Sequence, residues 1–118
     1  MKRVLEGLKP EKVFYYFEEI SKIPRCSGHE KQISDYLYNF ARSKNLEAIQ
    51  DEYLNVIIKK PASRGYENAP AVMLQGHMDM VCEKNEGVDH DFSKDPIKLR
   101  IKDGCIYASD TTLGADNG

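Results

Sequence analysis

"AVMLQGHMDMV", residues 71–81, begins as a short apolar run and ends with two ionisable side chains, His77 and Asp79. An apolar run of this length is typical of a strand that is covered on both faces of a sheet. Side chains alternate along a strand, so Gln75, His77 and Asp79 would share one side near its carboxyl end. Ligands bind at that edge in open α/β sheets. This stretch therefore predicts an α/β domain with a candidate site at His77 and Asp79.

Two helices are predicted upstream of this stretch. Residues 10–23 place Val13, Phe17 and Ile20 on one helical face, with Pro10 in the first turn. "PRCSG" then interrupts the pattern. Ser27 and Glu30 have the spacing of a capping box. A second helix is therefore expected to open there, with an apolar stripe formed by Ile33, Leu37, Phe40 and Ala41.

Strands are predicted on both sides of the central run. Residues 47–60 alternate and are rich in β-branched side chains, which favours two short strands around a turn near Glu52–Tyr53. Residues 61–70 form a polar loop rich in Pro and Gly. Residues 97–108 read as two strands joined by Asp103–Gly104, a strong hairpin signal. This order of elements predicts a mixed sheet flanked by helices.

The composition excludes several classes of protein. The chain has 118 residues, which suits one domain or a piece of a larger one, and it has no apolar run near the ~20 residues of a membrane helix. A net charge of −2 without a basic stripe indicates no nucleic-acid partner, and the opening residues lack the apolar core of a secretory signal. The three cysteines, Cys26, Cys82 and Cys105, are odd in number and scattered. They predict neither a disulfide framework nor a paired-cysteine zinc site, and they fit a reducing cytosol.

His77 and Asp79 form a coherent unit for metal binding. A histidine ligand commonly donates its second ring N–H to a carboxylate, which fixes the tautomer of the ring and raises its basicity. His77 would be the ligand and Asp79 its orienting partner. The alternative is that His77 only caps the strand and Asp79 begins a turn.

"TTLGADNG", residues 111–118, is the second candidate segment. Its glycines allow a sharp turn, and Asp116 could bind a cation through oxygen. The alternative is a helix N-terminus with Asp116 or Asn117 as the cap. We set two other features aside: the "DHD" run at 89–91, whose adjacent residues rarely converge on one ion, and Cys82, which lacks the histidine arrangement of a catalytic nucleophile.

Five blocks of the sequence, taken in order and with their spacing, resemble metallopeptidase family M20 and, within it, the aminoacyl-histidine (Xaa-His) dipeptidases. They are "IPRCSGHE", "NVIIKKPAS", "LQGHMDMVCEKN", "HDFSKDPI" and "TTLGADNG". The resemblance implies a catalytic domain of the zinc-peptidase (phosphorylase/hydrolase-like) α/β type. It also implies two divalent metal ions, usually zinc, with cobalt or manganese as alternatives. By motif, His77 would bind one ion, Asp79 would orient His77, and Asp116 would bridge both ions. The Asp116–Asn117 peptide would be cis, which is rare for a non-proline bond.

The same resemblance implies a reaction and a place in a longer protein. Two neighbouring metal ions can share a water, lower its pKa and polarise a scissile carbonyl. In the family, a downstream Glu-Glu pair supplies the general base and a further ligand, and residues 1–118 contain neither. Residues 1–118 would thus be the N-terminal portion of one catalytic domain, without the smaller lid and dimerisation domain, and inactive alone.

The full-length protein would be a cytoplasmic dipeptidase, possibly dimeric as its relatives commonly are, acting on small peptides and favouring Xaa-His substrates. Two alternatives stay open. One is another activity of the family, such as a broad dipeptidase, a tripeptidase or a deacylase. The other is a non-catalytic protein that has retained the fold.

Overall fold

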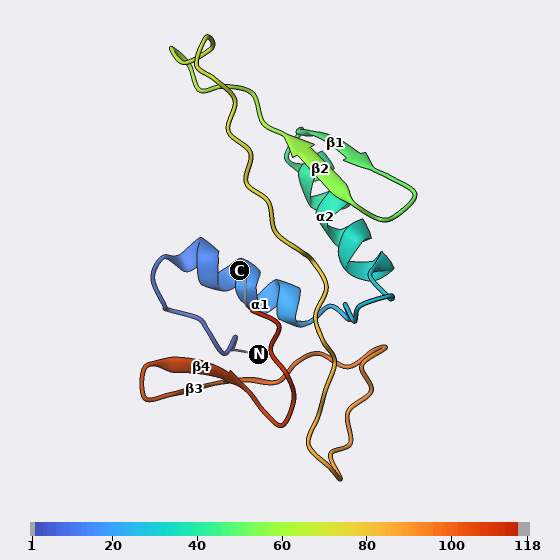
Figure 1. Ribbon diagram of the computed structural model, residues 1–118. Helices are drawn as coiled ribbons and strands as arrows, with labels where there is room; N and C mark the ends of the chain where they lie inside the picture. The colour runs from blue at the N-terminus through green and yellow to red at the C-terminus, as the bar shows by residue number, and fades with distance from the viewer. Residues whose placement is uncertain (1, 116–118) are drawn as a thin grey trace.

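A computed structural model of the protein describes residues 2–115 and shows an α/β arrangement (Figure 1). The predicted fold class is therefore confirmed, although the strands of the described part pair as two separate antiparallel hairpins. The elements in chain order are α1 (Glu11–Ser21), α2 (Lys31–Ser43), β1 (Glu47–Gln50), β2 (Val56–Lys59), β3 (Leu99–Lys102) and β4 (Cys105–Ala108). No helix in residues 2–115 is long and apolar enough to cross a membrane.

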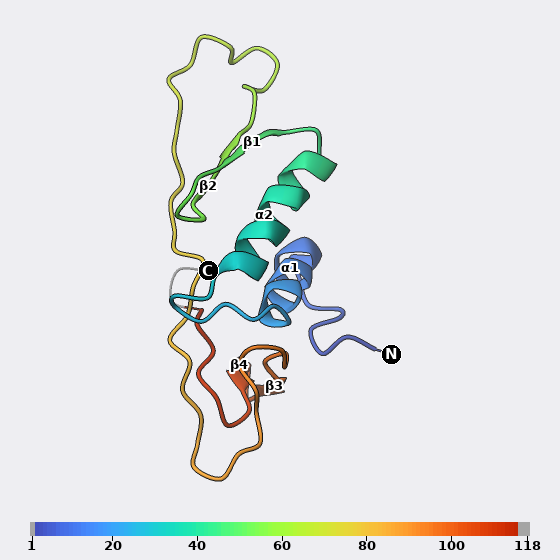
Figure 2. The ribbon, with the colours of Figure 1, turned by 90° about the vertical axis from the view of Figure 1, so that its right-hand side faces the viewer.

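Helix α2 packs against the β1–β2 hairpin, and both elements agree with the sequence prediction (Figure 2). Ile33 and Ala41, from the predicted apolar stripe, are buried. Polar contacts fix the hairpin to the helix as well. The Ser34 hydroxyl donates to the carbonyl of Leu54 at 2.7 Å, and the Gln50 side-chain amide donates to the Ser34 hydroxyl at 2.8 Å.

The β3–β4 hairpin also forms as predicted. Its turn residues Asp103 and Gly104 both have positive φ, at 51° and 76°, as a two-residue type I′ turn requires. The segment before β3 is attached to the end of α1, because the backbone N–H of Ile97 donates to the carbonyl of Ser21 at 2.9 Å. Ile97 is buried at this junction.

The central run does not form the predicted strand. Residues 71–79 are extended but carry no strand, and Val72, Met73 and Leu74 are 86%, 84% and 94% exposed. A strand exists only when a neighbouring strand accepts and donates its backbone hydrogen bonds, and residues 2–115 place no strand alongside this run. The expectation that alternation sets the sides of Gln75, His77 and Asp79 is wrong for the same reason. Figure 1 shows the segment passing between the two hairpins.

The capping box predicted for the second helix does not form. Helix α2 begins at Lys31 with Glu30 as the N-cap residue and no side-chain cap hydrogen bond. The Glu30 carboxylate instead accepts from the backbone N–H of Gly28 at 2.6 Å. The Ser27 hydroxyl is also engaged elsewhere, with Asp79 and Met80.

The prediction that the cysteines are unpaired is wrong for two of the three. Cys26 and Cys82 form a disulfide with a Cα–Cα distance of 5.6 Å, while Cys105 is free and exposed. The two partners are 56 residues apart, and the fold brings their segments together. The cysteines therefore give no support to the expected reducing cytosol.

Candidate functional site

His77 and Asp79 are in direct contact. Nδ1 of His77 lies 3.1 Å from Oδ1 of Asp79 and 3.0 Å from the Asp79 backbone carbonyl. Both oxygens accept, so the contact favours the tautomer in which Nδ1 carries the proton. The two side chains are partly exposed, at 43% for His77 and 32% for Asp79. The pair thus has the geometry of an imidazole oriented by a carboxylate.

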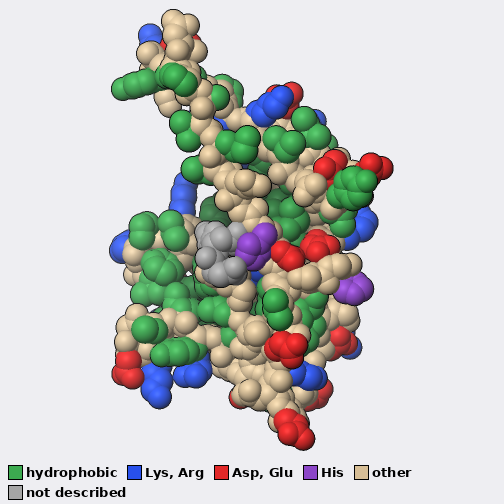
Figure 3. Space-filling model, in the orientation of Figure 1, with side chains coloured by type: hydrophobic (Ala, Val, Ile, Leu, Met, Phe, Trp, Pro, Cys, Tyr) green, Lys and Arg blue, Asp and Glu red, His purple; other side chains and the backbone are tan. Residues whose placement is uncertain are grey.

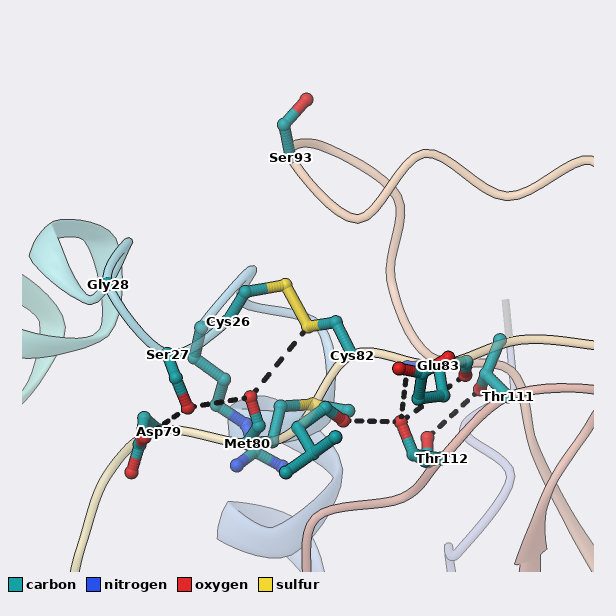
Figure 4. The surroundings of a disulfide bond; sticks show 12 residues. Cys26, Ser27, Gly28, Asp79, Met80, Cys82, Glu83, Ser93, Thr111 and Thr112 are labelled. Atoms are coloured by element: carbon teal, nitrogen blue, oxygen red, sulfur yellow. Dashed lines mark hydrogen bonds between the residues drawn. A yellow bond between two sulfur atoms is a disulfide. The ribbon is translucent and has the colours of Figure 1, made fainter.

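Ser27 holds the other oxygen of the same carboxylate. The Ser27 hydroxyl donates to Oδ2 of Asp79, and it also lies 3.3 Å from the backbone carbonyl of Met80 (Figure 4). The pKa of Asp79 is lowered from its usual value, chiefly because the Ser27 hydroxyl stabilises the ionised carboxylate; burial opposes this effect, and His77 adds to it. Asp79 is therefore an ionised acceptor between Ser27 and His77.

The segment that carries Ser27 is fastened beside the segment that carries Asp79. The backbone N–H of Met80 donates to the carbonyl of Arg25 at 2.9 Å, and the backbone N–H of Ser27 donates to the carbonyl of Met80 at 3.1 Å. The Cys26–Cys82 disulfide joins the same two segments (Figure 4). Met80 itself is buried. The position of Ser27 relative to Asp79 is thus set by backbone and covalent links.

The second candidate segment lies against the first. The backbone N–H of Thr112 donates to the carbonyl of Glu83 at 2.9 Å, and the Thr112 hydroxyl donates to the carbonyl of Val81 at 2.6 Å. The buried Arg25 guanidinium then donates to the carbonyls of Leu113, at 3.1 Å, and Gly114, at 3.3 Å. The chain therefore approaches the His77–Asp79 pair just before Asp116.

Asp116, Asn117 and the predicted cis peptide between them lie outside the described residues. Gly114 and Ala115, the last described residues before them, line the same groove as His77. The groove has a volume of about 550 Å³ and lies between α1, α2 and residues 76–78. It is mainly apolar, since its walls include Tyr16 together with residues of the predicted helix faces: Val13, Phe17, Ile20, Ile33 and Leu37.

The donors present fit one part of a metal site. His77 offers an imidazole whose orientation is fixed by a carboxylate, which is the usual arrangement around zinc. Within residues 2–115, however, no group of three or more His, Cys, Asp or Glu side chains converges. A catalytic zinc site needs about three protein ligands. A metal site at His77 would therefore need donors beyond those that the described residues bring together.

The "DHD" run, which sequence analysis set aside, has a structural explanation. His90 is 7% exposed and its ring meets that of Phe92 edge to face, with centroids 4.5 Å apart. Asp91 accepts from the hydroxyl and the backbone N–H of Ser93, at 2.6 Å and 2.9 Å. These contacts serve the loop itself.

Ser27 and Arg25 are neighbours of the site that the sequence alone did not predict. Both lie in the block "IPRCSGHE", which carries part of the family resemblance. That block was the available signal, but Ser27 was interpreted as a helix cap. Local spacing could not reveal a partner 52 residues away.

No family model matches the chain, but it is similar to curated proteins and to solved structures. The chain is 43% identical over 114 residues to the cytosol non-specific dipeptidase of Escherichia coli, a match that covers 97% of the chain and 24% of the relative. It is 31% identical over 94 residues to the succinyl-diaminopimelate desuccinylase of Corynebacterium glutamicum, covering 80% of the chain and 22% of the relative.

The crystal structure of the aminoacylhistidine dipeptidase from Vibrio alginolyticus matches with a TM-score of 0.91 and 41% identity. That match covers 98% of the chain and 24% of the solved chain. The chain thus spans about a quarter of the length of these relatives.

Proposed function

We propose that the full-length protein is a metal-dependent dipeptidase, because this chain is similar over nearly its whole length to about a quarter of two proteins named as dipeptidases. The observation that carries the proposal is the contact between His77 and Asp79, which gives an oriented imidazole at the edge of a groove. In this proposal residues 1–118 are the N-terminal portion of one catalytic domain. The remaining ligands and the general base come from the rest of the protein.

Each candidate residue has a distinct role in the proposal. His77 and Asp116 would hold the metal, and Asp79 would hold the Nδ1 proton of His77. Two divalent ions, with zinc first and cobalt or manganese as alternatives, lower the pKa of a shared water and polarise the scissile carbonyl when bound. Asp79 stays ionised because Ser27 stabilises its charge, so it keeps the imidazole in the tautomer that metal binding requires.

The substrate in this proposal is a small peptide, with Xaa-His dipeptides favoured. The name of the Vibrio relative supports a C-terminal histidine, and the name of the Escherichia relative supports broader dipeptide cleavage. We also propose a homodimer and a cytoplasmic location, the latter because the Escherichia relative is named for the cytosol. The Cys26–Cys82 disulfide stands against that location, since disulfides are rare in cytosolic proteins.

A deacylase is the second candidate function. It is favoured by the 31% identity to a relative named for desuccinylation. The metal site in both candidates would be the same, so the difference must come from the substrate. The third candidate is a non-catalytic protein with the same fold. In that case the site would neither bind metal nor hydrolyse any of these substrates.

The experiment uses the full-length protein supplied with zinc, cobalt or manganese. Hydrolysis of β-alanyl-histidine is compared with that of a non-histidine dipeptide and an N-succinyl amino acid, with and without chelator. His77→Ala should abolish metal-dependent cleavage, whereas His29→Ala, which changes an exposed histidine outside the groove, should leave it intact. Cleavage of the succinyl substrate alone would replace the dipeptidase by the deacylase. Metal-bound protein that cleaves none of the three would contradict both.

A further inference from the structure

Within residues 2–115, the hydroxyl of Ser27 donates only to the segment that carries the candidate site. The residue precedes α2, yet the helix begins at Lys31 without a side-chain cap hydrogen bond. Both acceptors of the hydroxyl, Oδ2 of Asp79 and the carbonyl of Met80, lie in the segment that carries His77. The side chain therefore acts on that segment across a sequence separation of 52 residues.

The Asp79 carboxylate lies between the Ser27 hydroxyl and the His77 imidazole. Ser27 takes one oxygen of the Asp79 carboxylate, and His77 takes the other through Nδ1 at 3.1 Å. A carboxylate that is free to rotate about its side-chain bonds would present either oxygen, or neither, to the imidazole. Fixing one oxygen, as the Ser27 hydroxyl does in Figure 4, removes that freedom and leaves the second oxygen facing Nδ1.

Ser27 itself cannot drift away from Asp79. Its backbone N–H donates to the carbonyl of Met80 at 3.1 Å, and Met80 in turn donates to Arg25 at 2.9 Å. Cys26, which lies between Arg25 and Ser27 in the sequence, is joined covalently to Cys82. Because this backbone is already fixed, the Ser27 hydroxyl can bind the carboxylate with little further loss of conformational entropy.

We propose that Ser27 is a positioning residue for the metal site, which acts by fixing the Asp79 carboxylate that orients His77. This inference rests on the proposed metal-dependent function. The inference goes beyond the proposed function because it assigns a role to Ser27, which would act on Asp79 and not directly on the metal or the substrate. Partners in this outer position commonly change metal affinity or activity by about 10- to 100-fold when they are removed.

The test measures zinc affinity of the full-length apoprotein by competition with a chelating indicator, together with kcat and KM for β-alanyl-histidine. Ser27→Ala should weaken zinc binding by roughly 10-fold or more and lower kcat, with KM within about twofold, because in this proposal Ser27 acts on Asp79 and not on the substrate. Ser27→Thr keeps the hydroxyl and should restore both values.

Ser93→Ala is the matched control, since Ser93 also donates to an aspartate, Asp91, at 2.6 Å. It should leave zinc affinity and kcat unchanged. Thermal unfolding of every variant is measured alongside, so that a general loss of folding is visible as such.

A double-mutant cycle shows whether Ser27 acts through Asp79. In an Asp79→Ala background, Ser27→Ala should cause no further loss of zinc affinity, because the carboxylate it positions is gone. Full additivity of the two losses would overturn the proposal. So would unchanged zinc affinity in Ser27→Ala, or equal losses in Ser27→Ala and Ser27→Thr.

Failure of the inference and failure of the proposed function give different results. If the wild type cleaves the dipeptide and binds zinc while Ser27→Ala matches it in both, only the inference fails. If the wild type binds zinc in a manner that depends on Ser27 but cleaves no dipeptide, only the proposed dipeptidase activity is rejected. A wild type that binds no zinc overturns both.

Discussion

Gly114 lies against Met80 and Arg25, and we expect a side chain at this position to destabilise the protein. Its φ is +69°, and a Cβ built there would lie 2.5 Å from Cβ of Met80 and 3.2 Å from Nη1 of Arg25. A left-handed residue costs about 1 kcal/mol and overpacking about 1–3 kcal/mol, so Gly114→Ala should lower the free energy of unfolding by about 2–4 kcal/mol. Denaturant unfolding of the full-length protein measures this loss.

Gly104→Ala provides the control for that measurement. Gly104 also has a positive φ, +76°, but a Cβ there would meet nothing within 4 Å. Only the backbone cost of about 1 kcal/mol should appear. Equal losses in the two variants would show that the close approach of Gly114 to Met80 does not exist.

Glu19 makes part of the stability dependent on pH. The Arg3 guanidinium donates to its carboxylate at 2.5 Å and lowers the pKa of Glu19, with burial opposing and Lys22 assisting. Because the folded pKa is depressed, this stabilisation is present above the unfolded pKa of about 4.5 and is lost as the pH falls through the folded value. Glu19→Gln should lower Tm by roughly 1–4 °C at neutral pH, and this deficit should shrink as the pH falls below 4.5 and through the lowered pKa of Glu19. A deficit that persists in acid would exclude the ion pair as its cause.

The residue scale also shows what the sequence can reveal about the candidate site. His77 and Asp79 are two residues apart, and their contact follows from local geometry, so the pattern predicted their association. Ser27 and Arg25 reach the site from about 50 residues or more away in sequence. Their hydrogen bonds depend on the folded chain, and Ser27 in particular had a plausible local interpretation as a cap that the structure does not use.

At the scale of elements, the Cys26–Cys82 disulfide is the strongest link between the segment before α2 and the segment after Asp79. It closes a loop with a sequence separation of 56 residues. Loop-closure entropy alone corresponds to about 4 kcal/mol of stabilisation for such a loop. Reduction, or the paired change Cys26→Ser and Cys82→Ser, should therefore lower the free energy of unfolding by up to about 4 kcal/mol.

Cys105→Ser is the control for the disulfide, because Cys105 is free and exposed. It should leave stability unchanged under both oxidising and reducing conditions. Thiol counting on the denatured protein gives an independent check: one free thiol per chain within residues 1–118 is expected before reduction and three after it. Three thiols before reduction would contradict the pairing.

The elements that the sequence predicted correctly are those whose signals are local. Both helices follow the 3.6-residue apolar period, and the β3–β4 hairpin follows from Asp103–Gly104, whose positive φ values suit the turn. The run 71–78 failed because an apolar segment becomes a strand only beside a partner, and residues 2–115 provide none. Each hairpin forms because its two strands are neighbours in the sequence and pair with each other. The predicted single sheet would have needed pairing between strands that are distant in the sequence.

The whole molecule is more open than a compact chain of its size. Its radius of gyration is 16.3 Å, whereas a compact domain of this length would have about 13.5 Å. Its accessible surface is 9160 Å², against about 6,500 Å² for a compact monomer of the same mass. Large apolar side chains contribute to this additional accessible surface. Figure 3 shows them gathered on the loop at residues 61–70 and over α1 and the β3–β4 hairpin. The buried apolar core is correspondingly small, consisting of Leu5, Ile33, Ala41, Met80 and Ile97.

An open chain with an unpaired apolar segment should associate with itself. Val72, Met73 and Leu74 are each more than four-fifths exposed, and their extended backbone can pair with a second copy. We therefore expect the 118-residue chain, prepared alone, to sediment as concentration-dependent oligomers. Burying one leucine side chain contributes about 1.5–3 kcal/mol, so Leu74→Lys should weaken association by roughly 10- to 100-fold.

Tyr66→Lys is the matched control for this measurement. Tyr66 is 68% exposed, but it lies in the polar loop outside the 71–74 segment. If apolar surface in general drives association, both lysine variants should dissociate the oligomers alike. If the unpaired segment drives it, only Leu74→Lys should do so. A chain that remains monomeric at all concentrations would show that residues 71–74 do not associate through their exposed edge. The exposed apolar surface of the chain would then not cause self-association.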